Sequence, residues 1–264
     1  MAFIRTHISC EHCGSSDGAS LNDDHSTYCF VCSTHTPSSE NITIIKETKV
    51  IEPIADMSFV KTYNNGNAVS VSERRITKST MEKYGVMRES NNFYFPYYDK
   101  DSQLVAAKVR PVADKKFSTV GKWTTGTLFG QNLYPSGGKY ITITEGEFDA
   151  LAAFQMTGSK WPVVSVRNGA GSALKDCKAQ YEYINSFETI VVCFDGDEPG
   201  IKAAKEVAEL FGNKCKLFKP MPDLKDACDW LSESKEAQFV DRWWRAEQFV
   251  PDGIVSGSTL WDLV

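Results

Sequence analysis

Two pairs of cysteines near the N-terminus have the spacing of a metal site. Cys10 and Cys13 form one CxxC pair, and Cys29 and Cys32 form the second after fifteen intervening residues. Each tight turn presents two thiolates, so the two pairs supply the four soft ligands of a tetrahedral zinc ion. A redox CxxC motif is the alternative, but the adjoining βαβ unit of a thioredoxin-like protein is missing. We therefore predict one structural zinc ion.

A second group of residues, far along the chain, has the chemistry of a magnesium site. Glu145, Glu147 and Asp149 alternate within one short segment, and Asp195 and Asp197 flank a glycine in another. Phosphoryl transfer on nucleotides commonly uses two divalent ions held by clustered carboxylates, which orient the attacking hydroxyl and stabilise the leaving pyrophosphate. Glu147, Asp149 or Asp197 taken alone is better explained as a helix cap. The whole set favours a site for two catalytic magnesium ions.

The segment between residues 100 and 122 is locally basic. Its charged residues are six cations and two acids, namely Lys100, Lys108, Arg110, Lys115, Lys116 and Lys122 against Asp101 and Asp114. The local balance of +4 contrasts with the net charge of −5 of the whole chain. The segment is therefore a candidate track for phosphate groups. A solvated charged face is the alternative, and charge counting does not separate the two.

Alternating strands and helices are predicted to position the acids. We expect strands at 140–144, 162–166, 189–194 and 215–218, separated by helices at 148–156, 172–183 and 199–211. This order is typical of a parallel α/β sheet. Ligands bind such sheets beyond the carboxyl ends of the strands, which is where Glu145 and Asp195 fall.

The basic segment belongs to a different predicted sheet. A short helix at 79–84 precedes a hairpin made of strands 93–98 and 104–110, so we expect antiparallel pairing. Alternate residues of a strand share a face, and Lys108 and Arg110 therefore lie on the same side of the hairpin.

Composition excludes several classes of protein. The chain of 264 residues has neither an apolar run long enough to span a membrane nor a secretory signal, so we expect a cytosolic protein without a membrane partner. Four of the eight cysteines fall in the two CxxC pairs, and the others are scattered among apolar segments. These scattered cysteines are predicted to be buried thiols rather than disulfides.

The two acidic segments, Thr144 to Asp149 and Phe194 to Gly200, resemble the pattern of the Toprim fold, a glutamate at a strand end followed later by a DxD motif. Together with the N-terminal zinc ribbon, they make the chain similar to the primase part of the primase-helicases of T-odd coliphages and, more distantly, to DnaG-type primases. The resemblance covers nearly the whole chain, from Cys10 to about Gly257.

The resemblance implies a small zinc ribbon tethered to a Toprim-containing RNA polymerase domain of mixed α+β and α/β class. Its implied parts are a ribbon at 1–36, a flexible linker at 37–57, a subdomain with basic strands at 58–137, a Toprim subdomain at 138–246 and a C-terminal linker at 247–264, leading to a helicase domain if the natural protein continues.

The resemblance also implies roles for individual residues. Glu145 is expected to act as catalytic acid or base and as a metal ligand, with Asp195 and Asp197 as catalytic metal ligands. The supporting magnesium ligands are expected to be Glu147, Asp149 and Asp226. The residues expected to bind nucleotide or template are Lys108, Arg110, Lys115, Lys116, Gly169 and Ser172. His25 is a further candidate because it lies near the zinc site in the sequence and could touch a base, with His12 as the alternative.

Two departures from the family pattern stand out. The phage relatives place a histidine three residues before the third cysteine, whereas this chain has Ser26 there and His25 one residue earlier, so its reading of the template is expected to differ. The chain also lacks a GxxxxGK[ST] motif, so no helicase motor is expected within these residues.

The function predicted from these features is that of a DNA primase, which makes short RNA primers from NTPs on single-stranded DNA for phage replication in the infected host cytoplasm. Its expected partners are the template, the RNA product, a replicative helicase in the same polypeptide or a separate one, and a replicative DNA polymerase. A non-catalytic recombination mediator of the RecR kind is the alternative, because it also joins four cysteines to Toprim. That family carries a helix-hairpin-helix before the zinc site, which this chain lacks. A Toprim nuclease or topoisomerase fragment is a third hypothesis, but those proteins lack an N-terminal zinc ribbon.

Overall fold

The computed structural model describes residues 3–37, 57–114 and 116–250. Contacts between Cα atoms divide the chain into two units, Met1–Ile54 and Ala55–Val264, and each is considered by itself. Most of the predicted linkers at 37–57 and 247–264 lies outside the described residues, as does Lys115. No helix in the described part of the chain is both long and apolar enough to cross a bilayer.

The N-terminal unit is an antiparallel sheet with very little core. Its strands, in spatial order, are β1 (Phe3–Ile8), β2 (Ala19–Asn22), β3 (Thr27–Cys29) and β4 (His35–Thr36). The buried apolar residues are Cys10, Ala19 and Cys29, with Ile8 and Cys32 packed against them. So small a core does not stabilise a fold without a further cross-link, which a metal ion at the cysteines would supply.

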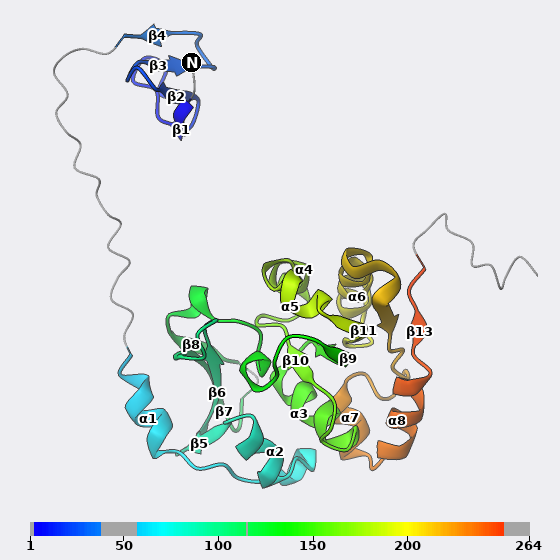
Figure 1. Cartoon of the computed structure of the whole chain (residues 1–264). Helices are drawn as coiled ribbons and strands as arrows, with labels where there is room; N and C mark the ends of the chain where they lie inside the picture. Colours follow the sequence, from blue (N-terminus) through cyan, green and yellow to red (C-terminus); the bar gives the residue numbers. More distant parts are fainter. Residues whose placement is uncertain (1–2, 38–56, 115, 251–264) are drawn as a thin grey trace, which may run out of the picture. The chain divides into compact units, whose positions relative to one another are not determined.

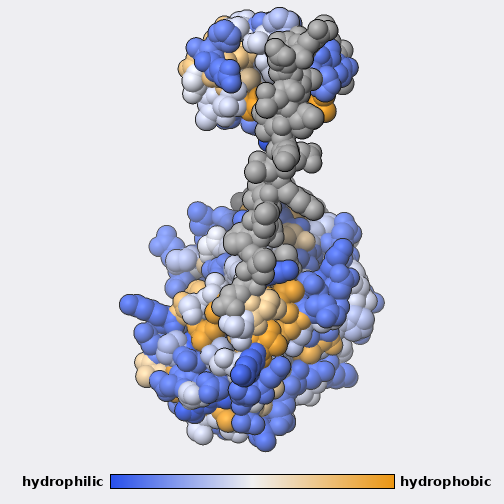
Figure 2. Space-filling view, turned by 90° about the vertical axis from the view of Figure 1, so that its left-hand side faces the viewer, coloured by the Kyte–Doolittle hydropathy of each residue, from blue (hydrophilic) through white to orange (hydrophobic). Residues whose placement is uncertain are grey.

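The second unit begins with a four-stranded antiparallel sheet. Its elements are α1 (Phe59–Asn65), α2 (Lys78–Lys83), β5 (Met87–Glu89), β6 (Asn92–Tyr98), β7 (Leu104–Pro111) and β8 (Ser118–Gly121). The strands lie in chain order, and the predicted hairpin is confirmed because β6 pairs antiparallel to β7. Phe59 and Tyr63 of α1 cover one face of the sheet against Tyr94 and Ala107. Figure 2 shows apolar surface on the side of the molecule that carries α1 and this sheet.

The second sheet is five-stranded. Its strands are β9 (Gly138–Thr144), β10 (Val163–Ser165), β11 (Phe187–Cys193), β12 (Cys215–Leu217) and β13 (Glu247–Gln248), in the spatial order β10-β9-β11-β12-β13. The first four are parallel, as predicted, and β13 adds an antiparallel edge. The predicted C-terminal linker is therefore wrong at its first two residues, because the backbone of Glu247–Gln248 pairs with β12.

Helices cover both faces of this sheet. They are α3 (Glu147–Met156), α4 (Ala170–Ala179), α5 (Tyr181–Asn185), α6 (Glu198–Phe211), α7 (Ala227–Ser232) and α8 (Glu236–Trp244). Figure 1 shows α4, α5 and α6 on one face and α3, α7 and α8 on the other. Two apolar cores result. One lies between the sheet and α4 and α6, and the other extends from α3, α7 and α8 to the antiparallel sheet.

The helix predicted at 172–183 is two helices. The backbone breaks at Gln180, between α4 and α5. Beyond the break, Tyr181 stacks on Phe211 with 5.4 Å between ring centroids, and Ile184 is fully buried. Tertiary packing against α6 thus redirects a segment whose local sequence is continuous with a helix. Helices α7 and α8 are not among the elements predicted from the sequence pattern, the last of which ends at residue 218.

Candidate active site

The acidic residues gather at one edge of the parallel sheet because two central strands end in register. In the pairing of β9 with β11, Thr144 lies opposite Cys193, so Glu145 and Asp195 leave adjacent strands shortly beyond the last pair. The carboxyl ends of parallel strands form the usual ligand-binding edge of a sheet of this kind.

Glu145 is half-buried in a narrow space. Its Oε2 atom is buried and has no hydrogen-bond partner within the described structure. Burial raises the pKa of Glu145, the nearby backbone amides of Ala170 and Asp195 lower it, and the charges of Asp197 and Asp226 raise it again. A buried carboxylate oxygen without a partner is costly, and a bound cation would satisfy it.

Two glycines leave room for this side chain. A Cβ atom at Gly169 would lie 3.4 Å from Glu145 Oε1, and one at Gly200 would lie 3.1 Å from Oε2. Gly169 also has a positive φ of 69°, a conformation that favours glycine. The glycine-rich turn before α4 and the first turn of α6 thus enclose Glu145.

The surroundings of Asp195 raise the pKa of its carboxyl group strongly. Burial raises its pKa to about 7, with further contributions from the charges of Glu145, Asp226, Asp197 and Asp229. Several carboxylates that cannot all ionise together without cost are an arrangement suited to divalent cations.

Asp149 and Asp226 meet on the α7 side of the site. Their carboxylate oxygens and the Cys228 sulfur all lie within 4.8 Å of one another. The Cys228 amide donates a hydrogen bond of 3.2 Å to Asp149. Burial, followed by the charges of Asp226 and Asp195, raises the pKa of Asp149 well above its usual range. A divalent ion has three donor atoms available at this point.

Two arginines lie beside these acids. The Arg74 and Arg110 guanidinium groups lie 4.6 and 5.4 Å from the centroid of the Phe148 ring, at the start of α3. Burial lowers the pKa of Arg110, and the charge of Arg74 lowers it further. The described structure thus pairs a cluster of carboxylates with two cations at a single edge, a combination that suits a ligand carrying both phosphates and metal ions.

The four cysteines of the N-terminal unit have the geometry of a zinc site. Cys10 Sγ lies 3.7 Å from Cys32 Sγ, Cys13 Sγ lies 3.7 Å from Cys29 Sγ, and all four sulfurs lie within 4.8 Å of one another. A tetrahedron with zinc–sulfur bonds of about 2.3 Å has edges of about 3.8 Å. The four thiolates therefore fit one zinc ion.

Comparison with known proteins assigns the family. The Toprim-like family model matches residues 142–231, which hold all six predicted magnesium ligands. The DNA helicase/primase of Enterobacteria phage T3 is 36% identical over 268 residues, which covers 98% of this chain and 46% of the phage protein. The crystal structure of the primase fragment of the bacteriophage T7 primase-helicase protein is 34% identical, with a TM-score of 0.64, over 91% of this chain and 99% of the fragment. The chain belongs to the phage primase-helicase family.

A further family structure holds T7 primase domains of two gp4 subunits, bound to an RNA/DNA hybrid and dTTP, with the T7 lagging-strand DNA polymerase. It is 33% identical, with a TM-score of 0.63, over 74% of this chain and 99% of the other. The present chain spans about half the length of the T3 protein and corresponds to the primase part of the family. The T3 and T7 relatives are primases, and nothing in them supports a recombination mediator.

Glu147 lies apart from the other acids of this primase-family site. Its carboxylate accepts hydrogen bonds from the Tyr97 hydroxyl and the Lys108 ammonium, and both charged side chains are buried. Lys108 also donates to the backbone oxygen of Arg167. The predicted metal ligand and the predicted phosphate-binding lysine therefore neutralise each other, because β7 directs Lys108 toward the first turn of α3. The solvated-face alternative is wrong for Lys108.

Asp197 and Asp226 also cap helices. Asp197 is exposed and accepts a hydrogen bond of 2.9 Å from Gly200 N at the start of α6. Asp226 accepts one of 2.8 Å from Asp229 N at the start of α7. Capping, the alternative considered for Asp197, is therefore present, and each carboxylate keeps a second oxygen for other ligands.

Three further residues predicted to bind nucleotide or template, Ser172, Lys116 and His25, lie in different units of the chain. Ser172 bonds to Asp176 at 3.1 Å, beside the ion pair of Asp176 with Arg167, so it takes part in an internal network. Lys116 is exposed, and His25 is exposed in the turn between β2 and β3.

Arg74 and Cys228 are site residues that the sequence does not reveal. The charge of Arg74 interacts with those of Asp149 and Asp226. Cys228 lies beside both acids, and its hydrogen bonds lower the pKa of Asp149. Neither their residue type nor their spacing signals that distant segments bring them to the acids.

Proposed function

We propose that this chain is a DNA primase that joins NTPs into short RNA primers on a single-stranded DNA template. The single observation that carries the proposal is the convergence of Glu145, Asp195, Asp149 and Asp226 at one sheet edge, with carboxyl pKa values raised by burial and mutual repulsion. Two magnesium ions held there would stabilise the pyrophosphate leaving group and orient the attacking 3′ hydroxyl.

The chain's own residues have distinct roles in this proposal. Asp195, Asp149 and Asp226 would hold the cations, and Asp197 would add an exposed carboxylate. Glu145, with its unpartnered buried oxygen, either ligates an ion or accepts a proton from the attacking hydroxyl, since its raised pKa suits a general base.

Cations beside the acids bind phosphate in this proposal. Arg110 and Arg74 both interact electrostatically with Asp149 and Cys228. Lys116 is exposed on the connection that follows β7. We expect Arg110→Ala to raise the Michaelis constant for NTP or to weaken DNA binding with a smaller dependence on salt. Lys178→Ala, at an exposed position of α4 outside the basic segment, is the control, and equal effects of the two variants would remove this role.

The zinc ribbon reads the template in this proposal, with one zinc ion bound by the four cysteines and His25 near the DNA. Further proposed partners are a replicative helicase and the replicative DNA polymerase of the phage, within the cytoplasm of the infected host. Support comes from the relatives, one described as a helicase/primase and one seen with a lagging-strand DNA polymerase.

Dinucleotide synthesis from two NTPs on single-stranded DNA, over a magnesium titration, tests the proposal. Asp195→Asn keeps the shape of the side chain but removes a charged ligand, and Glu145→Gln removes a base, so each should lower synthesis by at least about a hundredfold. Zinc content should remain that of the parent chain, and neither variant should unfold at a lower temperature than the parent chain. Synthesis at the parent level by both variants would contradict the polymerase assignment and leave a DNA-binding Toprim module.

A further inference from the structure

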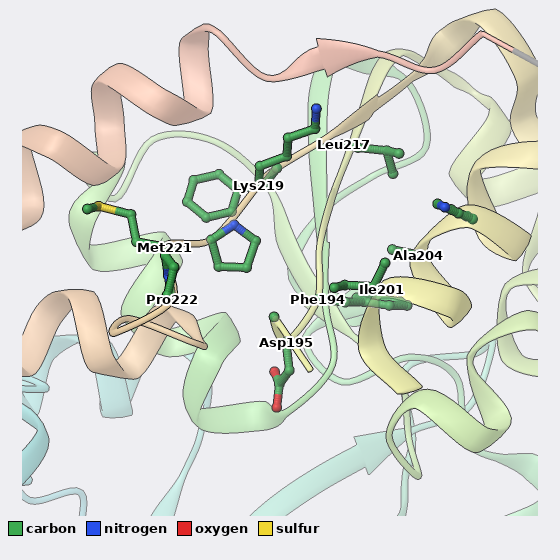
Figure 3. Close-up of a pocket in the computed structure, with 12 residues that line it drawn as sticks. Phe194, Asp195, Ile201, Ala204, Leu217, Lys219, Met221 and Pro222 are labelled. Atoms are coloured by element: carbon green, nitrogen blue, oxygen red, sulfur yellow. The ribbon is translucent and has the colours of Figure 1, made fainter. Parts of the chain in front are cut away.

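An open apolar pocket lies behind the loop that carries Asp195. Its volume is about 470 Å³, and its apolar lining includes Ile201, Ala204, Leu217, Phe218, Pro220 and Met221. We call it the α6 pocket. In Figure 3 the Asp195 carboxylate points away from Leu217 and Lys219, although Asp195 itself belongs to the lining.

The lining of the α6 pocket selects for an apolar group. The side chains that line it, apart from Asp195 and two lysines, carry no hydroxyl, amide or guanidinium group. A nucleobase has polar edges that need hydrogen bonds when they are buried, and this wall does not supply them. Ile201 and Met221 remain 47% and 38% exposed, so a large aliphatic or aromatic side chain would cover apolar surface that now faces water.

The rim of the pocket is positively charged. Lys205 and Lys219 line it, and a smaller neighbouring pocket of about 280 Å³ shares Leu217 and Lys219 and adds Arg242 and Arg245. The same neighbouring pocket contains two acids, Asp241 and Glu247. With Asp195, which also lines the α6 pocket, four cations against three acids leave a local excess of +1 on a chain whose net charge is −5.

One of these cations already binds a carboxylate. Lys219 forms an ion pair with Glu247 of β13, which demonstrates that a carboxylate fits at this rim. Arg245 pairs with Asp241 at 3.0 Å. Lys205 forms no ion pair with another residue in the described ranges and therefore has its charge available.

We propose that the α6 pocket binds an acidic peptide segment of a partner protein, with one bulky apolar side chain in the pocket and flanking carboxylates on Lys205 and Lys219. Apolar lining and complementary charge together give the two-part recognition that such a peptide requires. Asp195 lies at the border of this pocket and the acid cluster, but the residues proposed to hold the peptide, Ile201, Lys205 and Lys219, have no role in the proposed catalysis, and the proposal is independent of the polymerase assignment.

Fluorescence anisotropy with the full chain tests this proposal, in the absence of NTP, DNA and added magnesium. The probe is a short labelled peptide in which aspartates and glutamates flank one phenylalanine. Ile201→Ser and Lys205→Glu should each weaken binding at least about tenfold. Both side chains are exposed, so thermal unfolding should stay unchanged. Lys202→Glu, on the same helix but outside the pocket lining, is the matched control and should change binding less than about twofold.

Two competing peptides and one nucleic acid complete the experiment. Replacing the phenylalanine by serine, or the acids by asparagine and glutamine, should remove binding. Equal binding of the serine peptide, or no effect of Ile201→Ser, would overturn the proposal. A labelled single-stranded oligonucleotide should bind the parent chain and Ile201→Ser equally, and loss of oligonucleotide binding in that variant would assign the pocket to nucleic acid instead.

Discussion

At the scale of single residues, the site is defined by carboxyl groups that repel one another. Burial is the first cause of the raised pKa of Glu145, Asp149, Asp195 and Asp226, and the charge of at least one neighbouring acid adds to it in each. Such a cluster destabilises the metal-free protein. Divalent cations bound at this strand edge would neutralise the cluster.

The raised pKa of Asp195 predicts how stability depends on pH. Its pKa is about 7 in the folded chain, against 3.8 for an aspartate in water. Between these values the folded state holds a proton that the unfolded state has released. The contribution of Asp195 to folding stability is therefore fully present below about pH 4 and is lost as the pH rises through about 7.

Urea unfolding without added divalent ions, at pH 5 and pH 8, measures this effect. The parent chain should lose stability at pH 8, and Asp195→Asn, which cannot ionise, should lose less. Magnesium should recover stability at pH 8 in the parent chain only. The exposed Asp223→Asn variant serves as control, and the same pH slope in the parent chain and Asp195→Asn would refute the burial of this charge.

The buried pair of Glu147 and Lys108 predicts a loss of stability rather than of metal affinity. Glu147→Gln leaves the Lys108 charge buried without a counter-ion, which should cost about 3 kcal/mol of unfolding free energy. Lys108→Met in the same background should restore part of that loss. Glu82→Gln breaks the exposed pair with Lys78 and should cost less than about 0.5 kcal/mol. A magnesium requirement that rises sharply in Glu147→Gln at parent stability would instead make Glu147 a ligand.

At the scale of elements, the first turn of α6 packs directly on the end of β11. A Cβ atom at Gly200 would lie 2.4 Å from the backbone oxygen of Asp195, which neither element can accommodate without moving. The helix is held there by the Asp197 cap and by its buried residues Ala203 and Val207. Glycine at this position thus sets the distance between helix and acid cluster.

Gly200→Ala should therefore lower both stability and dinucleotide synthesis, with an overpacking cost of about 1–3 kcal/mol. Gly171→Ala is the matched control in α4, because a Cβ atom there meets nothing within 4 Å. It should leave synthesis unchanged and stabilise the chain by about 0.5–1 kcal/mol. Equal stability of the two variants in thermal unfolding would contradict the close approach at Gly200.

At the scale of the whole molecule, the chain consists of two units with very different means of stabilisation. The N-terminal unit has a minimal core around its cysteines, whereas the second unit has two extensive apolar cores. The first should therefore depend on zinc for folding, and the second should not.

Cys29→Ser tests this independence. The variant should lose its zinc and its selection of priming sites on single-stranded DNA, while extension of an annealed RNA primer should persist at a level within about tenfold of the parent chain. The thermal transition of the second unit should stay in place. Equal loss of both activities would contradict separate folding of the units.

The sequence alone determined which residues form two groups that fit metal ions, and most of the second unit's secondary structure. CxxC spacing implies zinc because a tight turn sets the distance between two thiolates, and apolar strands ending at Glu145 and Asp195 imply a shared edge because parallel strands align their ends. Only the tertiary structure decided the partners of the long side chains. Glu147 pairs with Lys108 and Tyr97, and Arg74 and Cys228 join the acids, because contacts between distant segments depend on how helices and sheets pack rather than on local spacing.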